Sequence, residues 1–207
     1  MAVFVGAAAA FVAILAGAEA ATRRWGIEAE LSRKVVHVAS AVVAAGLPWV
    51  MPFGTVVALG LAFVPFMVVS RRLDLFPAVH RVERTTLGEV WFPLGVALAA
   101  ALVPHRAAYG FGVLVMGLSD AFASLAGRRW GRRGYRGLLG ATKTWLGSAV
   151  FLATTVALGL ACGRRPVVVV AVVAVALVLT VVEGLLGRGT DNLVLPVTAA
   201  ALLRLLA

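Results

Sequence analysis

Asp120 stands within the apolar stretch YGFGVLVMGLSDAFASLAG, which runs from Tyr109 to Gly127. An ionised carboxylate at the centre of a membrane helix costs about 2.5–3.5 kcal/mol on insertion scales, so such a residue usually has a function. The next segment, GRRWGRRGYRGLLGATKTWLGS, places five arginines and Lys143 before another apolar run. An acid beside a basic, glycine-rich loop indicates metal-bridged phosphate chemistry.

A face of small residues continues from Asp120. Ala123, Gly127 and Gly131 follow it at intervals of three or four positions. Such a face lets a neighbouring helix approach closely, and it equally lets a nucleotide reach the backbone. Helix packing accounts for the glycines but leaves the acid unexplained.

The basic loop ends in GATKTWLGS, where Lys143 and Thr144 precede Gly147 and Ser148 at the start of the next apolar run. This segment is not a P-loop, because no glycine immediately precedes the lysine and no strand leads into it. A lysine beside the free amides of a helix N-terminus is still a favourable anion site. We therefore expect this segment to contact phosphate.

A second polar group lies where the second apolar run begins. The segment EAELSRKVVHVAS spaces four residues i, i+3, i+4 and i+7, which places them on one helical face: Glu30, Arg33, Lys34 and His37. Arginine binds phosphate bidentately and lysine binds it as a point charge. Snorkelling anchors are the alternative reading of the two cations, and helix packing is the alternative for the histidine.

Two further groups precede apolar runs. Arg84 and Glu89 lie in RVERTTLGEVWFPLG, where the acid either caps a helix or is a partner for a metal or a hydroxyl. Asp191 and Asn192 follow Glu183 in the segment where the chain turns back into apolar sequence. Such a pair builds a turn or a cap, or it belongs to the same site.

Composition identifies the class of protein. Hydrophobic residues make up 62% of the 207-residue chain and its mean hydropathy is +1.01, well above the roughly 45–50% apolar content of soluble domains. The net charge of +10 comes from basic residues between long apolar runs, where topology and lipid headgroups account for it. We therefore expect a polytopic membrane protein that binds no nucleic acid. The lone Cys162 can form no internal disulfide.

The apolar runs predict an all-α protein with seven transmembrane helices, or eight if the tail from Leu193 to Ala207 also spans. They cover residues 2–21, 35–51, 54–70, 90–104, 108–126, 144–162 and 166–183. The first run has no positive charge before it and is long enough to span, so we expect a mature helix rather than a signal peptide. No linker or repeat is evident, which predicts a single domain over residues 1–207.

The loops alternate in charge. Fifteen of the 19 Lys and Arg residues lie in alternate loops and three in the opposite ones, which by the positive-inside rule predicts a cytoplasmic basic side and an outside N-terminus in the cell's inner membrane. The acidic residues lie in or toward the same loops. A site there would meet cytosolic nucleotides.

From about Glu30 to Pro196 the chain resembles the CTP-dependent lipid kinase family, which includes dolichol kinase, phytol kinase and the CTP-using diacylglycerol kinase. The shared elements, in chain order, are Arg33-Lys34 with His37, Arg84 with Gly88-Glu89, the spaced set Asp120, Ala123, Gly127 and Gly131, Lys143-Thr144 with Gly147-Ser148, and Asp191-Asn192-Leu193 with Pro196. Leu146 stands where the family usually has an acid, and Thr142 replaces a frequent first lysine.

The resemblance implies transfer of the γ-phosphoryl group of CTP to the hydroxyl of a membrane lipid. It implies Mg²⁺ on Asp120 and Asp191, and catalytic roles for Asp120, Glu89 and His37, with Asp120 or Glu89 accepting the hydroxyl proton. The nucleotide would contact Arg33, Lys34, Arg84, Gly127, Gly131, Lys143, Thr144, Gly147, Ser148 and Asn192. Phytol, a polyprenol and diacylglycerol all remain as acceptors, and we favour an isoprenoid alcohol.

Two other functions stay open. A phosphatidate cytidylyltransferase also uses CTP in the membrane, but its late Lys-Arg and Lys-Asp signature has no counterpart in TDNLVLP. A small transporter also places acids in membrane helices, although its charges tend toward the midplane and its halves tend to repeat.

Overall fold

The computed structural model describes residues 1–80, 86–162 and 166–206. Within these ranges the chain is mostly helical, as the predicted all-α class requires, with one short hairpin. The helices are α1 (Ala2–Trp25), α2 (Ala29–Gly46), α3 (Phe53–Arg72), α4 (Pro77–His80), α5 (Gly88–Leu102), α6 (Arg106–Leu114), α7 (Asp120–Trp130), α8 (Trp145–Cys162), α9 (Pro166–Leu185) and α10 (Asp191–Leu206). A 3₁₀ turn η1 (Leu47–Trp49) follows α2, and a π-helical turn η2 (Val115–Ser119) joins α6 to α7.

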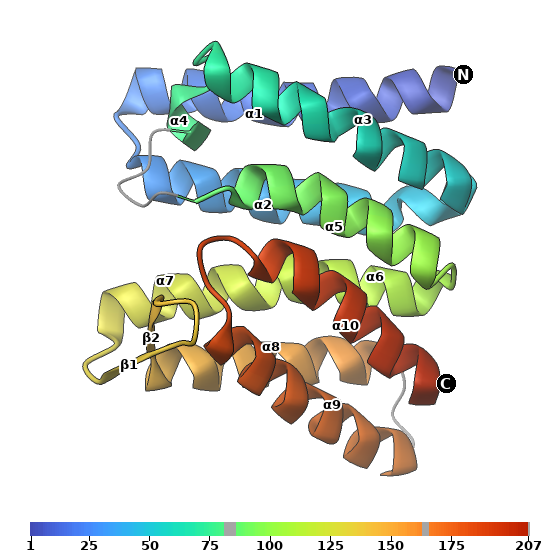
Figure 1. Ribbon diagram of the computed structural model, residues 1–207, viewed down its shortest axis with the longest axis vertical. Helices are drawn as coiled ribbons and strands as arrows, with labels where there is room; N and C mark the ends of the chain where they lie inside the picture. The colour runs from blue at the N-terminus through green and yellow to red at the C-terminus, as the bar shows by residue number, and fades with distance from the viewer. Residues whose placement is uncertain (81–85, 163–165, 207) are drawn as a thin grey trace.

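The long helices lie side by side in layers (Figure 1). The pair α1 and α3 forms one outer layer, α2 and α5 lie beneath it, α6, α7 and α10 come next, and α8 and α9 form the opposite outer layer. The chain reverses direction between successive long helices. The ends of α1, α3, α7 and α9 therefore meet the starts of α2, α5, α8 and α10 at one end of the molecule, called here the polar end.

Among the described residues, three helical segments are long and apolar enough to cross a bilayer by length and composition alone: Ala2–Trp25, Phe53–Arg72 and Arg106–Trp130. The segments Gly88–Leu102, Trp145–Ala161 and Val169–Leu185 are shorter apolar helices. The seven predicted runs lie mostly within helical segments, and the tail after Leu193 belongs to α10. The run 35–51 continues from α2 into η1, and the run 108–126 crosses α6, η2 and α7. The chain is an integral membrane protein, and its number of spans stays a prediction.

Exposed tryptophans mark both ends of the helix bundle. Trp25 ends α1, Trp130 ends α7 and Trp145 begins α8, all at the polar end, and Trp49 lies at the other end, in η1. Each is more than half exposed. Tryptophan is enriched at both membrane–water interfaces because its ring is amphipathic, so these positions fit a bundle that lies across a bilayer.

Glycines allow α10 to lie deep between α5 and α6. A Cβ at Gly95 would collide with the backbone carbonyl of Asn192, and one at Gly112 with that of Pro196. Small residues of this kind let membrane helices pack backbone to backbone. This packing brings the first residues of α10, including Asn192, to the polar end.

The π-helical turn η2 fixes the contact between α2 and the segment that leads to Asp120. Its Gly117 lies directly against Ala41 of α2, where a Cβ would overlap the alanine side chain. One turn further along α2, the Ala44 carbonyl accepts a 3.0 Å hydrogen bond from the hydroxyl of Tyr109. π-helical turns occur frequently at functional sites, and this one immediately precedes Asp120.

The basic loop differs from the sequence-based expectation. It forms an antiparallel hairpin of β1 (Gly134–Arg136) and β2 (Thr142–Thr144), so Lys143 lies in a strand and not at a helix N-terminus. The Thr144 hydroxyl accepts a 3.0 Å hydrogen bond from the Gly147 amide and caps α8. That amide is therefore occupied, which removes one of the free donors expected there.

Candidate functional site

A charged cleft opens at the polar end, between α2, α7, α10 and the hairpin. It encloses about 1700 Å³ of space, part of it open to solvent. Among the described residues, five basic and four acidic side chains line it: Arg33, Lys34, Arg128, Lys143 and Arg188, with Glu30, Asp120, Glu183 and Asp191. This polar cleft brings together predicted site residues from four of the five segments that the sequence singled out, and Thr86 of the fifth segment also lines it.

The buried ion pair of Lys34 and Asp120 closes the inner wall of the polar cleft. The lysine Nζ lies 2.6 Å from Oδ2 of the aspartate, and both side chains are less than a tenth exposed. Helix α2 supplies the cation and the start of α7 supplies the acid. Removing one partner of such a pair leaves a buried charge uncompensated, which typically costs about 3–5 kcal/mol.

His37 lies one turn beyond Lys34 on the same face of α2. Its Nε2–H donates a 3.0 Å hydrogen bond to the carbonyl of Met116, within the π-helical turn. Its ring also meets the edge of Phe92 at a centroid distance of 5.2 Å. His37 thus fastens α2 to the turn that presents Asp120, and it does not line the polar cleft.

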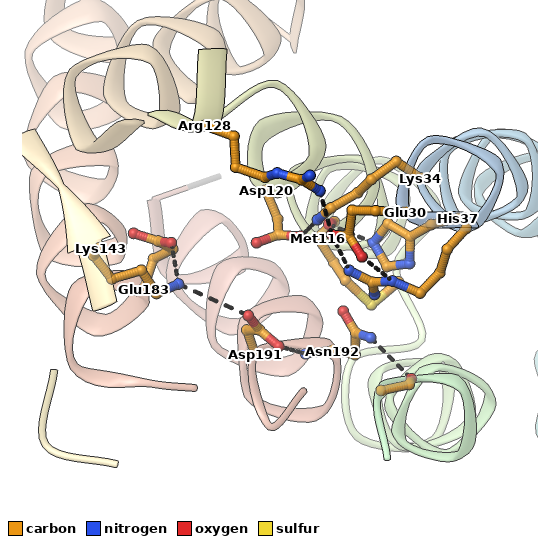
Figure 2. Close-up of polar contacts among 12 residues, drawn as sticks. Glu30, Lys34, His37, Met116, Asp120, Arg128, Lys143, Glu183, Asp191 and Asn192 are labelled. Carbon is orange, nitrogen blue, oxygen red and sulfur yellow. Dashed lines mark hydrogen bonds and ion pairs between the residues drawn. The ribbon is translucent and has the colours of Figure 1, made fainter. Parts of the chain in front are cut away.

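Lys143 connects the hairpin to two acids on the opposite wall (Figure 2). Its Nζ is in close contact with Glu183 and lies 3.9 Å from Oδ2 of Asp191. Burial by itself would lower the pKa of Lys143, but the carboxylates of Asp120, Glu183 and Asp191 outweigh burial and raise it. Lys143 is therefore a fixed positive charge facing the cleft.

A second network of charges forms the rim. Glu30 accepts two hydrogen bonds from Arg33, at 2.7 and 3.1 Å. Arg128 reaches across from α7 to Glu28 at 2.7 Å and to Glu30 at 3.8 Å. Glu30 thus positions the guanidinium group of Arg33, which has the geometry to bind a phosphate bidentately.

Several predicted site residues lie at the cleft but have structural partners. The Ser148 hydroxyl is 2.6 Å from that of Tyr135. A Cβ at Gly127 would lie 2.5 Å from the Thr144 Oγ1, and one at Gly131 would lie 2.9 Å from the Thr144 Cβ. These glycines bring α7 onto the start of α8, as the helix-packing alternative expected, and Gly127 also lines the cleft.

Asn192 joins α10 to α5 at the inner end of the cleft. Its side-chain amide donates a 2.8 Å hydrogen bond to the carbonyl of Gly88. Its backbone amide donates to the carboxylate of Asp191 at 3.1 Å. Asn192 therefore links Asp191 to the start of α5 through these two hydrogen bonds, and its side chain borders the cleft.

Glu89 lies apart from Asp120. Its carboxylate is in close contact with Arg71 of α3 and is 3.6 Å from Nδ1 of His80. It lines a second, mostly apolar cavity instead of the polar cleft. Arg84, the other residue of this predicted group, lies outside the described residues.

Sequence reasoning assigned no site role to three charged residues that line the cleft, although it grouped Glu183 with Asp191 and Asn192. Glu183 pairs with Lys143, Arg128 joins the rim, and Arg188 lies in the turn before α10 with a positive φ of 56°. Glu183 carried a usable signal, since it is an acid near the end of a long apolar run, as Asp120 is. Arg128 and Arg188 carried no such signal, because their sequence context is the same as that of the other basic residues in these loops.

The donor set of the cleft suits magnesium. Asp120 and Asp191 both line it, and carboxylate oxygens are the protein ligands that Mg²⁺ prefers. Within the described part of the chain, no three His, Cys, Asp or Glu side chains cluster as a metal site. Magnesium is commonly held by one or two carboxylates together with substrate phosphates and water, so the two acids fit such an ion.

The helical membrane bundle and a cleft lined by cations and acids suit a membrane enzyme that binds phosphate groups. Phytol kinase of Synechocystis sp. is 33% identical to this chain over 208 residues, covering 95% of this chain and 88% of that protein. No protein-family model matches the chain. No solved structure matches it either. The chain belongs to the CTP-dependent lipid kinase family, as the sequence motifs indicated.

Proposed function

We propose that this protein is a Mg²⁺-dependent kinase that transfers the γ-phosphoryl group of CTP to the hydroxyl of an isoprenoid alcohol. The coarser class, a membrane-bound lipid kinase, follows from its family. One observation carries the finer proposal: the polar cleft holds five cations and two suitable metal ligands, and it adjoins an apolar cavity within the bundle. The relative's name supports an isoprenoid alcohol as acceptor.

The reaction makes one bond and breaks one. The alcohol oxygen attacks the γ-phosphorus, the bond from that phosphorus to the β,γ-bridging oxygen breaks, and CDP leaves. The hydroxyl proton passes to a carboxylate of the site. Phosphoryl transfer of this kind needs positioning and neutralisation of charge more than covalent catalysis.

The cleft's own residues have distinct tasks in this proposal. Arg33 and Lys143 bind the phosphates, the first as a bidentate fork and the second as a point charge. Lys34 holds the Asp120 carboxylate in place through their 2.6 Å contact. Asp120 and Asp191 hold the metal ion, which when bound neutralises charge on the phosphates.

The same proposal places the cleft on the cytoplasmic side. The polar end gathers the loops that carry most of the basic residues, and positive loops stay cytoplasmic. CTP is a cytosolic nucleotide, so the orientation and the chemistry agree.

Product analysis tests the function. Purified protein in detergent would receive CTP, Mg²⁺ and a panel of acceptors: phytol, geranylgeraniol, a polyprenol, diacylglycerol and phosphatidic acid. We expect CDP and an alcohol monophosphate, with CTP preferred over ATP. Pyrophosphate and a CDP-lipid from phosphatidic acid would instead make the protein a cytidylyltransferase, the alternative that breaks the bond at the α-phosphorus. Absence of any lipid product with every acceptor would refute the kinase proposal.

A further inference from the structure

A second cavity lies between α1, α2, α3 and α5. It encloses about 760 Å³ of space, part of it open to the surroundings, and fifteen of the twenty described residues that line it are apolar or glycine. Four of its polar members gather toward one end, at Arg33, His37, Glu89 and Asn192, and Ser40 lies further along α2. We call this cavity the apolar slot.

The slot runs along one face of α2 into the bundle. Its lining on that helix extends from Arg33 to Ala44 and continues to Leu47 in η1. The part on α2 covers about 16 Å at 1.5 Å per residue. That is about half of the roughly 30 Å hydrocarbon core of a bilayer. Leu47 and Val56 lie at the deep end, and both are nearly fully buried.

The walls of the slot suit an apolar ligand. Small-molecule sites are lined mostly by apolar and aromatic side chains, with a few polar groups that fix the orientation of the ligand. The slot has a lining of this kind, with Phe11, Phe63 and Phe92 among its apolar residues. Its apolar walls offer little to water, whereas apolar cavities take up hydrocarbon.

The slot and the polar cleft meet at two residues. Arg33 and Asn192 line both cavities. Asp120 lines only the cleft, and Glu89 lines only the slot. A molecule whose chain fills the slot therefore ends beside Glu89 and next to the cleft that would hold the phosphates.

We propose that the apolar slot binds the hydrocarbon chain of a single-chain alcohol acceptor and presents its hydroxyl to Glu89 at the junction with the cleft. This inference rests on the proposed kinase function. It assigns the hydroxyl proton to Glu89 and leaves Asp120 on the nucleotide side. The slot's length selects alcohols of intermediate chain length, and its deep end at Leu47 and Val56 excludes much longer ones.

Chain-length selectivity tests the slot. We would measure kcat/KM for geraniol, farnesol, geranylgeraniol, solanesol and diacylglycerol. The wild-type protein should prefer geranylgeraniol over both solanesol and diacylglycerol. Ala44→Leu and Val56→Phe narrow the slot from two different helices, and either should shift the preference toward farnesol by about tenfold, as expected for a hydrocarbon pocket that changes by a few methylene groups.

Val42→Leu is the matched control, because Val42 lies on α2 but is 53% exposed on the outer face. Its selectivity should equal that of the wild type. If the folded slot variants keep the wild-type preference, the slot does not bind the acceptor. Mass spectrometry of the purified protein would then identify a bilayer lipid as the molecule that fills the slot. Equal use of diacylglycerol and geranylgeraniol would overturn the single-chain assignment. Failure of the wild type to phosphorylate any alcohol would count against the kinase function itself.

The variant Glu89→Gln tests whether Glu89 acts on the acceptor in the slot or on the nucleotide in the cleft. We expect a large loss of kcat with every alcohol while the KM for CTP stays within twofold of wild type, because Glu89 lies outside the cleft. A change in the KM for CTP with unchanged kcat would place Glu89 on the nucleotide side and overturn its assignment.

Discussion

The Nζ of Lys34 lies 2.6 Å from Oδ2 of Asp120, although 86 residues separate them in the sequence. The contact joins α2 to the start of α7 and closes the inner wall of the polar cleft. Both groups are buried, so each depends on the other for its charge. Removing either partner alone should therefore destabilise the protein. In the proposed function the pair also positions a metal ligand.

Variants of this pair should separate those two roles. Asp120→Asn should reduce turnover by a hundredfold or more, equivalent to about 2.7 kcal/mol, and should also lower the thermal midpoint because Lys34 loses its counter-ion. The double variant Lys34→Gln/Asp120→Asn should regain much of the stability, since two neutral amides can hydrogen-bond, but not the turnover. Thermal unfolding in detergent and a phosphorylation assay would measure both.

Asp74→Asn is the control for this prediction. Asp74 has a φ of 52°, which asparagine tolerates, and it lines neither cavity. It should keep wild-type activity. If Asp120→Asn keeps activity within about threefold, less than 1 kcal/mol of barrier, Asp120 is not a metal ligand.

The helices and their order were predictable from the sequence, because the length of an apolar run is read directly from residue types. The pairing of Arg33 with Glu30 also follows from their i, i+3 spacing. The partners of Lys34 and Lys143 were not predictable, since they come from distant segments brought together by packing. Motif reading grouped Glu89 with the phosphate site, whereas the packing of α3 against α5 pairs it with Arg71.

Two backbone features also escaped sequence reasoning. The π-helical turn adds a residue to one helical turn without any composition signal, and its Gly117 lies against Ala41 of α2. The hairpin around Lys143 is short and glycine-rich, so its sequence resembles an irregular loop. The apolar slot is a gap among four helices, and a gap depends on how side chains pack rather than on any one segment.

Lys143 should matter for the nucleotide more than for the acceptor. Lys143→Ala should raise the KM for CTP by about tenfold to a hundredfold, because hydrogen bonds to charged groups are worth about 1.5–3 kcal/mol. The KM for the alcohol should change little. Adding Glu183→Gln should recover stability by removing the unpaired acid, without restoring the KM. Arg132→Ala, an exposed cation of the same loop that does not line the cleft, is the control, and equal effects in both variants would exclude a phosphate contact by Lys143.

Orientation is testable by cysteine labelling. In a Cys162→Ser background, Leu138→Cys lies in the hairpin turn, where the native side chain is 80% exposed, and Ala107→Cys lies at the other end of the bundle. A membrane-impermeant maleimide should label only Ala107→Cys in intact cells and only Leu138→Cys in inverted vesicles. Detergent-solubilised protein, in which both should react, is the control. The reverse pattern would place the cleft outside the cell and contradict the use of a cytosolic nucleotide.

The close contact between Gly117 and Ala41 should set the spacing between α2 and η2, and through it the position of Asp120. Gly117→Ala should lower both stability and turnover, because its methyl group would overlap Ala41 and push α2 away from η2. Ala41→Gly/Gly117→Ala returns the lost space and should recover a large part of both. Gly17→Ala, in α1 with nothing near its added Cβ, should be neutral or stabilising by up to about 1 kcal/mol. Thermal unfolding and turnover would be measured for the wild type, Gly117→Ala, the double variant and Gly17→Ala. If Gly117→Ala is as stable and active as the wild type, α2 and η2 are not held at this distance.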